Sequence, residues 1–114
     1  MKIAISAAET SGDLIASSLV VALKQNQPSC EIDGLAGDKM VEAGCKRLWH
    51  MNDVNVMGFS EVLGKLTSII KLRKRIAKYY ISNKPDVFIG VDSPDFNFKL
   101  ERTLKIRGIK TIHF

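Results

Sequence analysis

The sequence predicts an α/β fold with a doubly wound, mostly parallel sheet of the Rossmann-like type. Short apolar runs of about five residues recur along the chain, and stretches with helical periodicity separate them. This alternation is typical of parallel sheets, whose strands are joined by right-handed crossovers. With 114 residues, the chain has room for one domain at most.

The first half of the chain alternates strand and helix twice. Residues 3–7 are a predicted strand, because small and β-branched apolar residues suit a buried parallel strand. Residues 14–24 carry a broad apolar face at helical spacing and predict the first helix. Glu31–Ala36 follows as the second strand, residues 39–43 as a short helix and residues 47–49 as a brief third strand.

The second half continues the same pattern. Residues 59–83 are mainly helical, and this helix ends before Pro85, since proline disfavours the helical conformation in the residue before it. Val87–Val91 is a strand of apolar residues. Residues 95–107 predict a further helix, and residues 110–114 a last strand.

The composition is that of a globular protein and excludes disordered and low-complexity classes. Hydrophobic residues make up 46% of the chain and charged residues 25%, and the mean hydropathy is +0.03. No apolar run approaches the ~18 residues of a membrane span. Cys30 and Cys45 lack a scaffold or metal-ligand spacing, which indicates free thiols in a reducing compartment. We therefore expect a cytoplasmic protein without a metal.

The net charge of +5 comes from one segment. Residues 62–85 hold seven bases and no acid, whereas the rest of the chain has ten bases against twelve acids. Three interpretations remain open. The apolar residues of the segment face the core and its charges are solvated, or the helix lies on an anionic membrane surface, or it binds nucleic acid as part of a Rossmann-like nucleotide- or nucleic-acid-binding module.

Two loops follow strands at the edge where parallel sheets bind ligands. The first, residues 8–13, has neither the dinucleotide-binding nor the P-loop pattern of glycines. Ser11 or Thr10 either caps the next helix or contacts a ligand, and Glu9 can accept hydrogen bonds from a sugar hydroxyl.

The second loop, residues 92–97, places Asp92 directly after a buried strand. A carboxylate at this position is partly removed from water and can act as a general base. Alternatively, Asp92 caps the following turn and Asp95 caps the helix after Pro94. The residues alone leave both interpretations open.

Five motifs stand out along the chain: AAETSGD at 7–13, GLAG at 34–37, VMGFSEVL at 56–63, KPDVFIGVDSPDFN at 84–97 and GIKTIH at 108–113. They occur in the order found in lipid-A-disaccharide synthases, a family that the chain resembles over essentially its whole length. Where this chain has Ala8, the family commonly has glycine, whose missing side chain can matter in a tight loop.

The resemblance implies an inverting glycosyltransferase of the GT-B type. Residues 1–114 would be its N-terminal Rossmann-like domain, truncated, with the UDP-binding C-terminal domain absent and the fragment alone inactive. The family joins UDP-2,3-diacylglucosamine to 2,3-diacylglucosamine 1-phosphate, giving lipid A disaccharide 1-phosphate and UDP. It works without a cofactor or metal, peripherally on the anionic cytoplasmic face of the inner membrane of Gram-negative bacteria. Nucleic acid is not an expected partner, and a homodimer is left open.

The resemblance also implies residue roles. Asp92 is the catalytic base. The substrate-binding or cleft-organising residues are expected to be Glu9, Ser11, Asp13, Met57, Gly58, Asp95 and Asn97. The face toward the membrane or the acceptor lipid is expected to consist of Val62, Leu63, Leu66, Ile69, Ile70, Lys71, Arg73 and Lys74.

Overall fold

The computed structural model describes residues 1–54 and 62–114, except for the side chains of residues 62–65. Met57 and Gly58, which the resemblance assigns to substrate binding, lie outside the described residues. The side chains of Val62 and Leu63 lie outside them as well.

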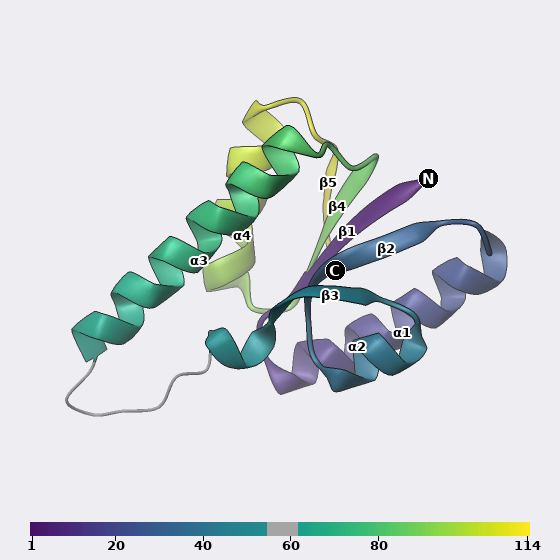
Figure 1. The fold of residues 1–114 in the computed structure, drawn as a ribbon, viewed down its shortest axis with the longest axis horizontal. Coiled ribbons are helices and arrows are strands. Elements are labelled where there is room, and N and C mark those ends of the chain that lie inside the picture. Colours follow the sequence, from purple (N-terminus) through teal and green to yellow (C-terminus); the bar gives the residue numbers. More distant parts are fainter. Residues whose placement is uncertain (55–61) are drawn as a thin grey trace.

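The elements follow the predicted alternation of strand and helix (Figure 1). In chain order they are β1 (Lys2–Ala7), α1 (Thr10–Asn26), β2 (Glu31–Ala36), α2 (Asp38–Ala43), β3 (Lys46–His50), a 3₁₀ turn (Met51–Asp53), α3 (Val62–Ser82), β4 (Val87–Val91), α4 (Pro94–Ile106) and β5 (Thr111–His113).

The strands form a parallel sheet in the order β3-β2-β1-β4-β5. Helices α1 and α2 pack on one face of this sheet, and α3 and α4 pack on the other (Figure 1). The prediction of a doubly wound, Rossmann-like α/β fold is therefore confirmed.

Helix α1 begins at Thr10, earlier than the predicted start at residue 14. The residues of its first turn are polar or small, so they do not contribute to the apolar pattern from which the helix was predicted. The helix is nevertheless already formed there, because the carbonyl of Glu9 accepts a hydrogen bond from the backbone N–H of Asp13 at 2.9 Å.

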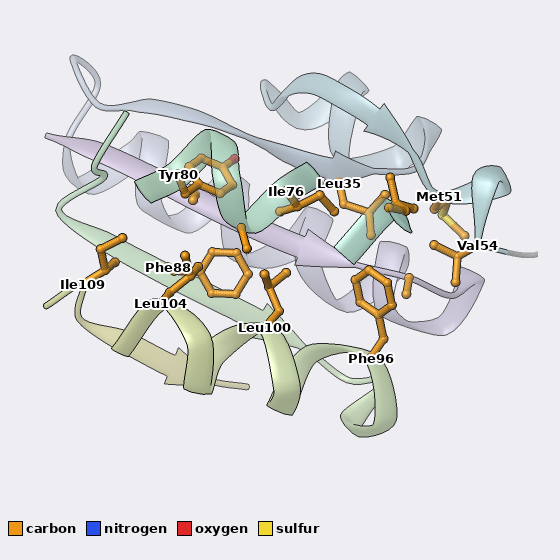
Figure 2. Close-up of a cluster of buried hydrophobic side chains, with 14 residues drawn as sticks. Leu35, Met51, Val54, Ile76, Tyr80, Phe88, Phe96, Leu100, Leu104 and Ile109 are labelled. Atoms are coloured by element: carbon orange, nitrogen blue, oxygen red, sulfur yellow. The ribbon is translucent and has the colours of Figure 1, made fainter. Parts of the chain in front are cut away.

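The core on the α3/α4 face joins these two helices to the middle of the sheet, as Figure 2 shows. Its centre includes Ile76 and Tyr80 of α3 and Phe88 of β4. The hydroxyl of Tyr80 donates a hydrogen bond of 2.6 Å to Asp33 of β2. Burial, together with this hydrogen bond, raises the pKa of Tyr80 well above its usual range. The core interpretation of the basic segment is thus confirmed for the second half of α3.

Both cysteines are free and buried, as their spacing indicated. Burial raises the pKa of the Cys45 thiol to about 12. Because the thiolate is the reactive form, Cys45 serves the core as a small apolar side chain.

Candidate functional site

The two loops that the sequence singled out lie side by side at the carboxyl edge of the sheet. Strand β1 pairs with β4, and Ala7 lies opposite Val91 at the ends of the two strands. Chain order reverses here, since β2 and β3 lie on one side of β1 while β4 and β5 lie on the other. Such a switch point is the usual ligand-binding position of an open α/β sheet.

A hydrogen bond joins the two loops directly. The hydroxyl of Ser11 donates to Oδ2 of Asp92 at 3.1 Å. Glu9, which is exposed, precedes α1, and no side chain caps this helix. The alternative in which Ser11 or Thr10 caps α1 is therefore wrong, and Ser11 instead orients the carboxylate of Asp92.

Close packing of α1 on β4 depends on Gly12. A Cβ atom at this position would lie 3.3 Å from the carbonyl oxygen of Val91 and 3.6 Å from the Cβ of Asp92. The absence of a side chain lets the first turn of α1 approach the end of β4, which brings Ser11 within reach of Asp92.

Asp92 and Ser93 have left-handed backbone conformations, with φ angles of 53° and 43°. Residues other than glycine rarely adopt such angles, and they do so where surrounding contacts enforce them. Ala8 is not among the residues with positive φ, so the side chain that replaces the family's glycine fits its loop without backbone strain.

Asn97, which is fully buried, supplies the contacts that hold this turn. Its Nδ2 donates to the backbone carbonyl oxygens of Asp92 at 3.0 Å, Val91 at 3.2 Å and Ser6 at 3.1 Å. Its Oδ1 accepts a 2.7 Å hydrogen bond from the hydroxyl of Ser6, which is also buried. The side chain therefore fastens the Asp92–Ser93 turn to strand β1.

Asp13 is buried and links helix α1 to helix α2. Its two carboxylate oxygens accept hydrogen bonds from the backbone N–H groups of Lys39 and Met40, at 3.1 and 3.0 Å. These bonds satisfy donors at the start of α2 and join that helix to α1. Gly37 permits the approach, because a Cβ there would lie only 2.5 Å from the Asp13 carboxylate.

Asp95 is exposed in the first turn of α4, with Pro94 before it. The residue that precedes the helix is Ser93, and no side chain caps α4. The alternative in which Asp95 caps this helix is therefore wrong, and Asp95 lines the same pocket as Asp92.

A pocket of about 380 Å³ opens beside Asp92. It is bounded by the β1–α1 loop, Val54, α3 and the start of α4. The lining residues are Ala8, Glu9, Val54, Leu66, Ile69, Arg73, Asp92, Ser93, Pro94, Asp95, Phe96 and Lys99. Phe96 and Val54 also belong to the core and so connect the pocket to it (Figure 2).

Six of these lining residues were not among the predicted site residues: Ala8, Val54, Ser93, Pro94, Phe96 and Lys99. Sequence reasoning placed Arg73 on the face toward the membrane or the acceptor lipid, and in the structure Arg73 is half-buried in the pocket wall. The sequence does indicate that Arg73 shares a helix face with two apolar lining residues, because Leu66, Ile69 and Arg73 have the i, i+3, i+7 spacing of one face.

The remaining residues of the expected membrane or acceptor face differ in exposure. Leu66 and Ile70 are 54% and 39% exposed, and Lys71 and Lys74 are also exposed. Ile69 is partly buried against the core. As far as Lys74, α3 thus presents large apolar and basic side chains to solvent, whereas Ile76 and Tyr80 farther along are buried in the core.

Within residues 1–54 and 62–114, no group of three or more His, Cys, Asp or Glu side chains is placed to hold a metal ion. In the same part of the chain, no helix has the length and apolar character that crossing a membrane requires.

The fold and the site define a Rossmann-like domain with a carboxylate-containing pocket at its switch point. Comparison with known proteins gives the family. The family model described as lipid-A-disaccharide synthetase matches residues 3–114, and the chain belongs to this family.

Named relatives agree with this assignment. The chain is 48% identical over 114 residues to the lipid-A-disaccharide synthase of Francisella philomiragia, which covers 100% of this chain and 30% of the relative. It is 48% identical over 112 residues to that of Methylobacillus flagellatus, covering 98% of this chain and again 30% of the relative. The chain thus spans under a third of the length of these relatives, and nothing in them favours the nucleic-acid-binding alternative.

A solved structure shares the fold. The UDP-GlcNAc 2-epimerase of Neisseria meningitidis, bound to UDP-GlcNAc, superimposes with a TM-score of 0.54 at 14% identity. The match covers 100% of this chain and 32% of the epimerase chain. At this identity, the likeness concerns the fold alone.

Proposed function

We propose that this chain is the N-terminal domain of an inverting GT-B glycosyltransferase, and that a second domain of the full-length protein binds UDP. The transferase joins UDP-2,3-diacylglucosamine to 2,3-diacylglucosamine 1-phosphate and releases UDP. The observation that carries the proposal is the oriented carboxylate of Asp92 at the switch point, in a chain of this family.

The proposed mechanism needs one base. The 6-hydroxyl oxygen of the acceptor attacks the anomeric carbon of the donor from the side opposite UDP. As the new C–O bond forms, the bond from the anomeric carbon to the UDP oxygen breaks, and Asp92 takes the hydroxyl proton. Attack from the opposite side inverts the anomeric configuration.

In this proposal, the other site residues bind the sugars of the substrates or border the acceptor. Glu9 and Asp95, both exposed in the pocket wall, accept hydrogen bonds from sugar hydroxyls. Met57 and Gly58 border the acceptor pocket in this proposal, and the reaction uses neither a cofactor nor a metal.

The direct test is transfer by the full-length protein. Purified protein is incubated with both lipid substrates in detergent micelles, and we expect lipid A disaccharide 1-phosphate and UDP in equal amounts. Mass spectrometry of the lipids and a coupled assay for UDP measure the two products. If a folded full-length protein releases UDP without forming the disaccharide, the proposed function is wrong.

We also propose that the first half of α3 lies on the anionic cytoplasmic face of the inner membrane. The exposed Leu66 and Ile70 would enter the boundary between headgroups and acyl chains, and Lys71 and Lys74 would attract anionic lipids. The acceptor, itself a lipid, would then enter the pocket from the side where Leu66 lines it.

Replacing Leu66 and Ile70 together by serine should weaken binding to phosphatidylglycerol vesicles about tenfold or more, because two apolar side chains no longer leave water. Vesicle flotation of the full-length protein measures the effect. The matched control is Val21→Ser, which changes a residue 42% exposed on α1, across the sheet. Equal losses in both variants, or equal binding to neutral phosphatidylcholine vesicles, would contradict the proposal.

A further inference from the structure

Two buried polar side-chain atoms have no hydrogen-bond partner among the described residues, Nε of Arg73 and Oγ of Ser93. Both residues line the pocket beside Asp92. Native proteins satisfy the large majority of their buried polar atoms, so an unpaired one calls for a specific explanation, such as a bound ion. That both unpaired donors border one pocket points to a ligand with acceptor oxygens at this position.

The backbone of Ser93 is held in place. Ser93 is only 7% exposed and sits in the left-handed turn that Asn97 fastens to β1. The backbone position is therefore set without any contact of the Ser93 hydroxyl, which has no partner among the described residues and can donate to a ligand.

The Arg73 guanidinium is also held without an ion pair. Its central carbon lies 5.1 Å from the centroid of the Phe96 ring, and among the described residues no carboxylate lies within ion-pair distance of it. Burial lowers the pKa of Arg73. The guanidinium group nevertheless stays charged at neutral pH, because arginine is not deprotonated in proteins. The pocket wall thus contains a partly desolvated cation that has no ion-pair partner among the described residues.

The chemistry favours a phosphate joined to a sugar over free phosphate. Guanidinium and hydroxyl donors, with Lys99 as a second cation on the wall, match phosphate oxygens. Glu9, Asp92 and Asp95 face the same space and repel a free anion. A sugar phosphate offsets this repulsion, because its hydroxyl groups donate hydrogen bonds to those carboxylates while its phosphate contacts the cations.

We propose that Arg73 and Ser93 form the subsite for the 1-phosphate of the acceptor, an inference that rests on the proposed transferase function. The acceptor carries both a phosphate and the hydroxyl that must reach Asp92, and the pocket presents groups for both. Arg73 then belongs to substrate recognition as well as to the basic surface of α3.

Steady-state kinetics of the full-length protein test this subsite with two acceptors, one bearing and one lacking the 1-phosphate. Arg73→Gln should raise KM for the phosphorylated acceptor about 10- to 100-fold, as expected for loss of a hydrogen bond to a charged group. Its KM for the unphosphorylated acceptor and for the donor should not change. Ser93→Ala should show the same selectivity with a smaller effect, and Arg73→Lys should recover part of the affinity.

The matched control is Arg75→Gln, which removes the same charge from an exposed position of the same helix and should leave both KM values unchanged. Equal losses with the two acceptors would assign Arg73 to packing on Phe96 and overturn the subsite. A rise in the donor KM alone would assign Arg73 to the diphosphate and overturn it as well. If the wild-type protein performs no transfer, calorimetric binding of the two acceptors to wild type and Arg73→Gln decides the subsite separately from the function.

Discussion

Replacing Asp92 by asparagine should lower kcat of the full-length protein about 10²- to 10⁴-fold, the usual contribution of a positioned general base. Asparagine keeps the shape of the side chain and an oxygen that can accept the Ser11 hydrogen bond, so the loop contact between α1 and β4 survives. What disappears is the ability to take the proton of the attacking hydroxyl. KM for the acceptor should change little, since the contacts of its phosphate are untouched.

The chain offers a close control at the other end of the same strand. Asp86 precedes β4 and is exposed, and its carboxylate accepts a hydrogen bond from the backbone N–H of Lys2 at 2.8 Å. Asp86→Asn therefore makes the same chemical change at the edge of the sheet away from the pocket, and kcat should stay at the wild-type value. Wild-type turnover in a folded Asp92→Asn protein would remove Asp92 from the role of base.

Parallel-sheet rules explain why the place of the site could be predicted from the sequence. Val87–Val91 is an apolar run with Pro85 before it and Asp92 after it, so both the strand and its carboxyl end are visible in the chain. The same holds for β1 and its loop. Since such ends meet at one edge, the contact between Ser11 and Asp92, 81 residues apart, follows from topology together with local pattern.

The orientation of α3 could not be predicted in the same way. This 21-residue helix has apolar residues around much of its circumference, and the sequence alone does not say which of them meet a partner. Leu72 and Ala77 are buried in the core that α3 shares with α4, whereas Leu66 and Ile70 are exposed. The packing of α3 on α4 also explains why Arg73 lies in the pocket wall, since its guanidinium lies over the ring of Phe96 of α4.

The left-handed turn at Asp92 and Ser93 was also invisible in the sequence. Neither position of the turn is a glycine, which would indicate a left-handed conformation, and Ser93 precedes a proline, which restricts the backbone of Ser93 further. The conformation is imposed by hydrogen bonds from Asn97 to carbonyl groups that only the folded sheet brings together. Strain of this kind concentrates at functional sites, and here it aims the proposed base.

Asn97→Leu should be the most damaging substitution outside the reacting groups. Leucine matches the size of asparagine but leaves the buried hydroxyl of Ser6 and the carbonyl of Asp92 without the partner they now have. We expect a loss of about 3–5 kcal/mol in the stability of the β4–α4 region. The freed turn should also move Asp92, and a displacement of about 1 Å is enough to lower kcat roughly 100-fold.

Hydrogen–deuterium exchange with peptide resolution measures the stability effect in the full-length protein, because it reports β4 and α4 separately from any other domain. Asn83→Leu is the matched control, since Asn83 is exposed and its side chain donates a hydrogen bond to the Tyr79 carbonyl at the end of α3. A double-mutant cycle makes the test specific: Ser6→Ala should cost about 1 kcal/mol in the wild type and much less once Asn97 is leucine. Additive effects would mean that Ser6 and Asn97 act independently. Wild-type exchange in Asn97→Leu would mean that the turn keeps its strained backbone without the hydrogen bonds of Asn97.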